Sequence, residues 1–141
     1  MDYKKEDDIK VLVKLIDPAG KNVVLVKELF MDVTKVKKDE WSHLLEEIDF
    51  NIVASLYYPI YDKYFTHNEI KELIKFYSSP AGVKFVQSKG NSYRQIILTQ
   101  DELNQIDQFK KTGVGEKYNK LINKISHQHT KLVKKYIESL R

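Results

Sequence analysis

The spacing of apolar residues predicts two helices at the start of the chain. From Ile9 to Ile16, apolar residues recur at intervals of three and four, as on one face of an α-helix. Asp17 and Pro18 then form the pattern of a helix N-cap followed by proline at the first helical position. We therefore expect a second helix that begins at Pro18 and carries apolar side chains as far as Phe30.

A longer helix is expected after the polar segment 34–38, which has no periodicity. This helix would begin near Asp39, and its apolar stripe continues as far as Leu56. Pro59 lies inside the continuing apolar pattern, where a proline removes a backbone hydrogen bond. We therefore predict that the helix bends or breaks just before this proline.

The central region contains one pattern twice, because residues 65–85 align with residues 98–118 at an offset of 33. Each copy predicts a helix start with a capping box, a short helix, a tight turn and a second helix. Phe76 of the first copy and Phe109 of the second are expected to lie in the core. The recurring positions include Thr66, Glu69, Phe76, Ser79, Gly82, Thr99, Glu102, Phe109 and Gly115, and Pro80 belongs to the motif of the first copy alone.

We expect these recurring residues to serve local structure, within two repeat units at about 65–97 and 98–130 of a single domain that spans 1–141. The alternative is that Glu69 and Glu102 form a pair of catalytic carboxylates.

Composition favours the same fold class, all-α, as a compact multi-helix bundle with two pseudo-repeated helix–turn–helix units. The chain has only 5 Gly and 3 Pro, and the absence of cysteine excludes disulfides and thiolate metal sites. No stretch approaches the roughly 20 apolar residues of a membrane-spanning helix. Residues 1–8 have no apolar region of a signal peptide, so an exported form would have lost its leader.

Two motifs in the first repeat unit carry a family resemblance. Phe65 to Ile70 reads hydrophobic-Thr-x-x-Glu-hydrophobic, and Phe76 to Lys84 reads Phe-Tyr-x-Ser-Pro-x-Gly-x-Lys. Together with the tyrosine-rich segment before them, they resemble the bacterial family called domain of unknown function 2059, over about residues 50–110. The resemblance implies an all-helical domain, commonly exported to the periplasm or carried as a lipoprotein. It supplies no established activity and hence no catalytic residues.

Histidines are the first candidates for a metal or acid–base site. His127 and His129 lie two residues apart in an expected helix, so their side chains point to different faces. His43 and Glu47 have the i, i+4 spacing of a ligand pair, with Glu40 nearby, but such a charged helix face is usually only solvated. We therefore predict no metal and no cofactor.

Tyrosines are concentrated around Pro59 and the first repeated turn. Because a tyrosine buries its ring while keeping a hydroxyl available, the cluster could line a ligand groove or a partner surface. Packing in the core is the alternative. The residues concerned are Tyr57, Tyr58, Tyr61, Tyr64 and Tyr77.

The net charge of +4 comes from the C-terminal segment, since residues 113–141 hold seven basic and two acidic residues. An apolar stripe predicts a helix from about 114 to 140, which could contact an anionic membrane or an acidic partner. A solubilising outer face is the alternative. Only two basic residues of the chain are arginine, which argues against nucleic-acid recognition. The basic face would consist of Lys117, Lys120, Lys124, Lys131 and Lys135.

The sequence therefore favours a non-enzymatic binding or interaction module of the bacterial cell envelope, with an unknown protein or small ligand as partner. The alternative is a hydrolase or metal-dependent enzyme whose site is assembled by the fold, with Glu40, His43 and Glu47 as candidates. A weaker alternative is binding of anionic surfaces or nucleic acid through the basic helix. The ligand, the oligomeric state and the natural N-terminus are left open.

Overall fold

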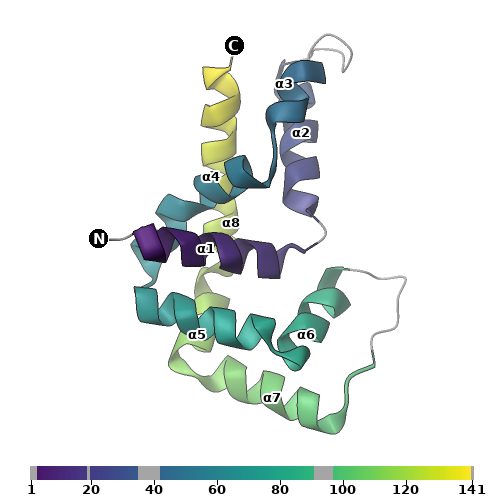
Figure 1. The fold of residues 1–141 in the computed structure, drawn as a ribbon, viewed down its shortest axis with the longest axis vertical. Helices are drawn as coiled ribbons and strands as arrows, with labels where there is room; N and C mark the ends of the chain where they lie inside the picture. Colours follow the sequence, from purple (N-terminus) through teal and green to yellow (C-terminus); the bar gives the residue numbers. More distant parts are fainter. Residues whose placement is uncertain (1–2, 19, 35–41, 91–96, 141) are drawn as a thin grey trace.

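A computed structural model describes residues 3–18, 20–34, 42–90 and 97–140, and within these ranges it contains eight α-helices and no β-strand (Figure 1). The all-α prediction is confirmed. In chain order the helices are α1 (Tyr3–Ile16), α2 (Lys21–Thr34), α3 (Ser42–Glu47), α4 (Phe50–Tyr64), α5 (His67–Ser78), α6 (Pro80–Gly90), α7 (Gln100–Lys111) and α8 (Gly113–Ser139).

The last helix, α8, runs along the length of the molecule and connects its two ends (Figure 1). At one end lie α5, α6 and α7, and at the other lie α2, α3 and the C-terminus. Between them, α1 crosses the molecule and packs against α4 and α5. None of the helices within the described ranges combines the length and the apolar character needed to cross a bilayer.

The buried side chains form two cores, both completed by α8. The larger core includes Ile9 and Leu12 of α1, Leu73 of α5 and Ile125 of α8. The smaller core lies between α2, α4 and the C-terminal half of α8, where Phe30 is 1 % exposed. The ring of Tyr57 packs against both cores, so the middle of α4 marks their junction.

The start of the second helix differs from the prediction, because α2 begins at Lys21 and not at Pro18. Asp17 still caps the helix: its carboxylate accepts hydrogen bonds from the backbone amides of Lys21 (2.9 Å) and Asn22 (2.8 Å). Gly20, with φ at +70°, makes the intervening turn that a residue with a side chain adopts only with strain.

The single long helix expected from Asp39 is wrong, because α3 ends at Glu47 and α4 begins at Phe50. Asp49 has an extended backbone and its carboxylate accepts a hydrogen bond from the Ile52 amide at 3.2 Å, so a new N-cap interrupts the apolar stripe. Of the loop predicted at 34–38, Thr34 is instead the last residue of α2, and the rest of it, like the expected start near Asp39, lies outside the described residues.

Pro59 does not break α4, which continues to Tyr64, so that part of the prediction is wrong. The bend stays a prediction. A proline in a helix loses one hydrogen bond, and neighbouring packing can compensate for the loss. Here the residues that follow, Ile60 and Tyr61, are each 3 % exposed.

The repeated helix starts have closely similar geometry. Thr66 accepts a hydrogen bond from the Glu69 amide at 3.2 Å, and Glu69 accepts one from the Thr66 amide at 2.9 Å. The matching distances between Thr99 and Glu102 are 3.1 and 3.0 Å. Both threonines therefore form a complete capping box, at the start of α5 and of α7.

The turns that follow each capped helix are also alike. The Ser79 hydroxyl accepts a hydrogen bond from the Gly82 amide at 3.1 Å, and the Thr112 hydroxyl accepts one from the Gly115 amide at 3.0 Å. Pro80 is the first residue of α6, as expected for a proline that follows an N-cap. Superposition of the two repeat units as whole bodies stays a prediction.

The prediction that Phe76 and Phe109 lie in the core is wrong. Both are half-buried at the edge of the larger core. Their rings stack on each other with centroids 3.8 Å apart and planes at 3°. The phenylalanine of each unit therefore stacks face to face on its counterpart, which places both rings between the units.

Candidate ligand-binding site

A cavity of about 170 Å³ lies at the junction of the two cores, between α1, α2, α4 and α8. Its walls are mainly apolar, with aromatic rings on two of the helices. The lining residues are Val13, Ile16, Asn22, Tyr57, Tyr61, Tyr118, Ile122, Ile125 and Ser126.

Helical spacing explains why these side chains share one space. Tyr57 and Tyr61 lie one turn apart on α4, and Tyr118, Ile122 and Ile125 follow the same spacing along α8. On α8, Tyr118 and Ile125 are buried, whereas Ile122 is 37 % exposed. Ile122 therefore lies at the edge of the cavity that faces solvent.

The two most deeply buried hydroxyls of the cavity belong to Tyr61 and Tyr118 and lie 3.1 Å apart. At the other side, the Tyr57 hydroxyl donates a long hydrogen bond of 3.5 Å to Oδ1 of Asn22. Burial raises the pKa of Tyr61 and of Tyr118 well above the ordinary value of a tyrosine. Burial, with a smaller contribution from the charge of Asp17, raises the pKa of Tyr57 to about 12.

Behind the cavity wall, His129 stacks on Tyr57 with ring centroids 3.5 Å apart and planes at 3°. His129 is 5 % exposed, and its Nε2 atom has no hydrogen-bond partner among the described residues. Burial lowers the pKa of His129 to about 4, with a hydrogen bond to the backbone of Val53 acting in the opposite direction. The imidazole is therefore neutral at neutral pH.

The predicted tyrosine cluster is divided by the structure. Tyr57 and Tyr61 line the cavity, whereas Tyr58 and Tyr64 are half-buried and lie outside it. The Tyr64 hydroxyl accepts a hydrogen bond from Gln128 at 2.6 Å. Tyr77 is 6 % exposed and packs edge-on against Phe76, Phe109 and Tyr118, so it belongs to the core.

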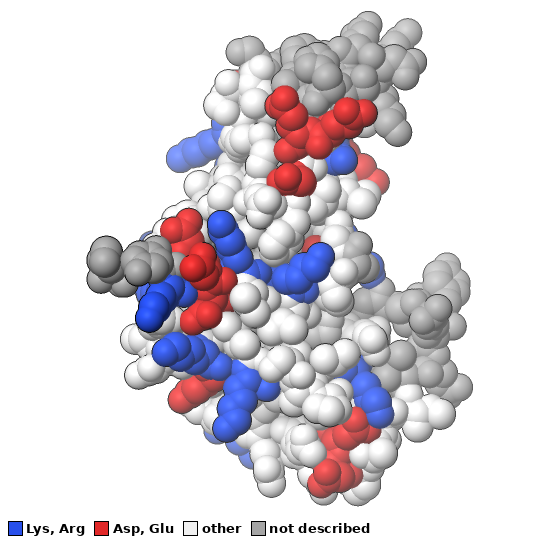
Figure 2. Space-filling view, in the orientation of Figure 1, with Lys and Arg blue, Asp and Glu red and all other residues white. Residues whose placement is uncertain are grey.

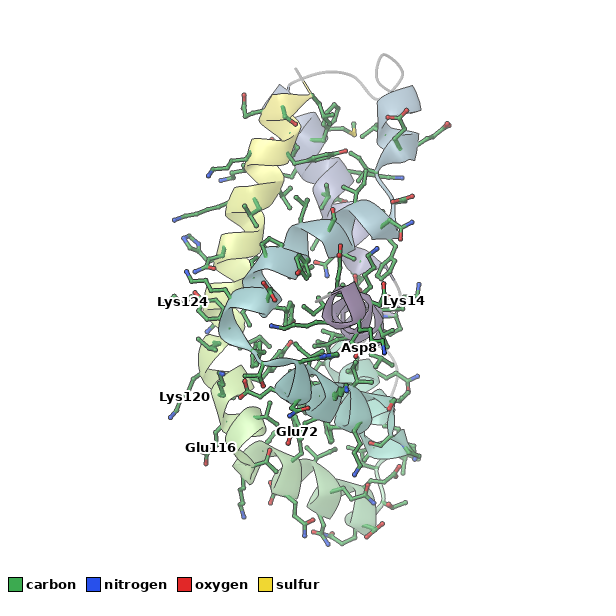
Figure 3. The ribbon with its side chains drawn as sticks, turned by 60° about the vertical axis from the view of Figure 1, so that its left-hand side comes forward. Asp8, Lys14, Glu72, Glu116, Lys120 and Lys124 are labelled. Carbon is green, nitrogen blue, oxygen red and sulfur yellow. The ribbon has the colours of Figure 1, made fainter. Side chains whose placement is uncertain are left out.

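The lysines of the predicted basic face are not equivalent. Lys117 is bound to Glu69 at 2.9 Å and lies over the ring of Phe65, so its charge is compensated. Lys120 and Lys124 project outward in a row with Glu116 along α8 (Figure 3). Lys131 and Lys135 are also exposed. On the face shown in Figure 2, acidic and basic side chains are interspersed.

The glutamates weighed as catalytic carboxylates are engaged in structure. Besides its capping box, Glu102 forms an ion pair with Lys84 at 2.8 Å, and the hydrogen bond from Lys84 lowers its pKa. Burial raises the pKa of Glu69, but hydrogen bonds from Thr66 and Lys117 outweigh it and the net pKa is lowered. Both carboxylates are therefore ionised and paired with a lysine of the other repeat unit.

Only some of the remaining enzyme candidates are described by the structure, and none of those lines the cavity. Glu40 and the side chain of His43 are outside the described residues, and Glu47 is exposed on α3. His127 is exposed and His129 is buried, so the two do not converge. Within the part of the chain that the structure describes, no group of three or more His, Asp or Glu residues could hold a metal ion.

Sequence reasoning did not identify Asn22, Ile122 or Ser126 as residues of a ligand site. The apolar stripe of residues 114–140 did contain Ile122, but periodicity alone does not show which helix a stripe faces. The available signal for the burial of His129 was its spacing, because it lies four residues after Ile125 and four before Val133 on that stripe.

Comparison with known proteins supports the family resemblance. Residues 54–97 match the family described as "Uncharacterized protein conserved in bacteria (DUF2059)". The matched segment includes Tyr57 and Tyr61 of the cavity and continues through α5 and α6. No significant match was found among curated proteins or among solved structures.

Proposed function

We propose that this protein, which carries the DUF2059 segment at residues 54–97, is a non-enzymatic binding module that holds a small ligand in the cavity between α1, α2, α4 and α8. The observation that carries the proposal is the cavity itself, whose walls are apolar and aromatic with a few inward polar groups. Binding sites for small molecules are typically built in this way.

The size of the cavity supports a compact ligand. An apolar cavity of about 150 Å³ in a helical protein is large enough to bind benzene. At about 170 Å³, the present cavity offers similar room. The aliphatic walls from Val13, Ile16 and Ile125 favour an apolar body, because its transfer from water is favourable by about 25 cal/mol per Å² buried.

The protonation states of the nearby groups favour binding over catalysis. Tyr57, Tyr61 and Tyr118 keep their protons at neutral pH, since their pKa values are raised. His129 remains neutral under the same conditions because its pKa is lowered. These groups supply hydrogen bonds but neither a phenolate nucleophile nor a base tuned to neutral pH.

We place the module in the bacterial cell envelope. The support is the family resemblance, which implies exported proteins. The reading frame upstream of Met1 in the genome, and fractionation of cells that express the natural gene, test this location. A leader or a lipid-attachment cysteine upstream would support it, whereas recovery of the natural product in the cytoplasm alone would contradict it.

The binding proposal is tested by adding benzene to ¹⁵N-labelled protein and following amide shifts. We expect saturable shifts at the cavity residues of α4 and α8. Replacing Ile122 by Trp should block the cavity from its exposed edge and weaken binding at least tenfold. Ile97→Trp is the matched control, because Ile97 is 81 % exposed and does not line the cavity.

Binding by Ile97→Trp that equals the parent, with loss in Ile122→Trp at an unchanged melting temperature, would support the proposal. Absence of any saturable shift in the parent protein would contradict it. Shifts confined to other helices would contradict it equally, because the ligand would then occupy a different site.

A further inference from the structure

The hydroxyl groups of Tyr61 and Tyr118 together have one more donor proton than they have hydrogen-bond acceptors. Each hydroxyl carries one proton and can also accept. Their single hydrogen bond of 3.1 Å uses one of the two protons. No acceptor among the described residues takes the second proton, although the two side chains are only 3 % and 5 % exposed.

A buried donor proton without an acceptor is costly, so its environment should supply one. Both hydroxyl-bearing rings line the cavity, and most of the other lining side chains are aliphatic and offer no acceptor. The polar side chains of the lining, Asn22, Tyr57 and Ser126, form no hydrogen bond with the pair in the described part of the chain. With no acceptor engaged by the protein itself, the contents of the cavity are the source of an acceptor that the pair can reach.

The charge of the ligand follows from the same lining. Among the residues that the structure describes, no lysine, arginine, aspartate or glutamate lines the cavity. An ionised ligand would lose its hydration there without an opposite charge to compensate for the loss. A neutral ligand avoids this penalty.

We propose that the cavity selects a compact neutral ligand with an apolar body and one hydrogen-bond acceptor, such as a carbonyl oxygen, which accepts the spare proton of the Tyr61–Tyr118 pair. The inference rests on the proposed function, since it names the class of ligand for that same cavity. It also assigns a role to two tyrosines: together they supply one directed donor.

Either tyrosine alone retains a proton to donate. In Tyr61→Phe, the Tyr118 hydroxyl loses its partner but keeps its proton, and the reverse holds in Tyr118→Phe. The preference for an acceptor should therefore survive each single substitution and disappear only in the double variant. A merely structural role of the pair does not produce this pattern.

The test compares benzene, benzaldehyde and benzoate by NMR titration of the full chain. We expect the parent to bind benzaldehyde about tenfold more tightly than benzene, the ratio that corresponds to one net hydrogen bond. Benzoate should bind more weakly than either. The double variant should bind benzene and benzaldehyde equally. Tyr77→Phe is the matched control, because Tyr77 is buried to a similar degree but does not line the cavity.

Three outcomes overturn the inference in different ways. Equal affinity of the parent for benzene and benzaldehyde would show that the spare proton is satisfied by water, and the proposed function would stand without this selectivity. If neither compound binds, both the proposed function and the inference fail. If the double variant unfolds, the two single variants still decide: loss of the benzaldehyde preference in both would contradict a shared donor.

Discussion

His129 is a buried ionisable base beside the cavity, and its environment favours the neutral ring. It is 5 % exposed, stacks on Tyr57, and leaves Nε2 without a partner among the described residues. A charged imidazolium there would be desolvated, and no carboxylate of the described residues forms an ion pair with it. Folding therefore holds this histidine in its unprotonated form.

Stability should fall when the pH is lowered, because the unfolded chain binds a proton at His129 more readily than the folded protein does. The pKa of His129 drops from an ordinary 6.5 to about 4 on folding. The stabilisation is fully present above pH 6.5, declines as the pH falls, and is lost by about pH 4. The shift corresponds to about 3 kcal/mol in the free energy of unfolding. Urea unfolding between pH 4 and pH 8 measures it.

Two variants test whether His129 causes this pH dependence, and the control is His127, two residues away from it. His129→Phe keeps a ring to stack on Tyr57 but cannot titrate, so it should flatten the decline between pH 6.5 and pH 4. His127 is exposed, and His127→Gln should leave the profile of the parent unchanged. An identical decline in the parent and in His129→Phe would show that other groups cause it.

For single residues, the sequence predicted local hydrogen bonds better than it predicted the burial of side chains. Thr66 and Thr99 could be assigned to capping boxes because both partners of each box lie within three residues. Phe76 and Tyr77 are adjacent and both aromatic, yet one is half-buried and the other lies in the core. That difference is set by the neighbouring helices, which no local pattern contains.

The tight turns between α5 and α6 and between α7 and α8 require glycine for steric reasons. A Cβ atom at Gly82 would lie 2.0 Å from the carbonyl oxygen of Phe76, and one at Gly115 would lie 2.0 Å from that of Phe109. These obstacles are backbone atoms that cannot rotate away. Each turn must therefore open to admit a side chain.

Gly82→Ala and Gly115→Ala should each destabilise the protein by about 1–3 kcal/mol, the usual cost of overpacking a close contact. Chemical denaturation of each variant measures the change. Gly113→Ala is the control, because Gly113 has no atom within 4 Å of an added Cβ and α8 gains a better helix former. Destabilisation by Gly113→Ala equal to that of the other two would indicate a general intolerance of the turn and not the steric clash.

Element boundaries could be predicted where the signal was local and failed where two local signals competed. The starts of α5 and α7 follow their capping boxes. At Asp49, an N-cap overrides an apolar periodicity that continues on both sides, and periodicity gave no sign of this.

The repeat also hides a difference in burial: Ile70 is fully buried, whereas the equivalent Leu103 is 45 % exposed.

Across the whole molecule, long-range pairing joins the two repeat units. Lys84 of the first unit binds Glu102 of the second, and Lys117 of the second binds Glu69 of the first. Lys84 and Lys117 are equivalent positions of the two units, as are Glu69 and Glu102. The sequence alone did not predict that each lysine pairs with the glutamate of the other unit, because residues far apart in the chain are brought together only by packing.

The cavity is also formed by residues that only packing brings together. Its walls come from α1, α2, α4 and α8, and only the α4 residues had been proposed as a ligand surface. Tyr57 and Tyr61 were recognisable as amphipathic rings near a proline. Asn22 and Ser126 carry no signal of their own, since a single polar residue on a helix is ordinary until a fold places it beside a cavity.

Because α8 completes both cores, its removal should destroy the fold. Tyr118 and Ile125 pack in the larger core, and Val133 and Ile137 pack in the smaller one. Deletion of residues 114–141 should expose both cores, so that the product aggregates or binds a hydrophobic dye and loses its cooperative unfolding transition. Recovery of a folded monomer would show that α8 is an appendage.

A shorter deletion separates the two cores. Ending the chain at residue 130 removes Val133 and Ile137 but keeps Tyr118 and Ile125. The amides of α2 should then lose protection from hydrogen exchange, while those of α5, which contribute to the larger core, should retain most of it. If α2 and α5 lose protection together, the two cores unfold as one cooperative unit. The cavity at their junction would then depend on the whole length of α8.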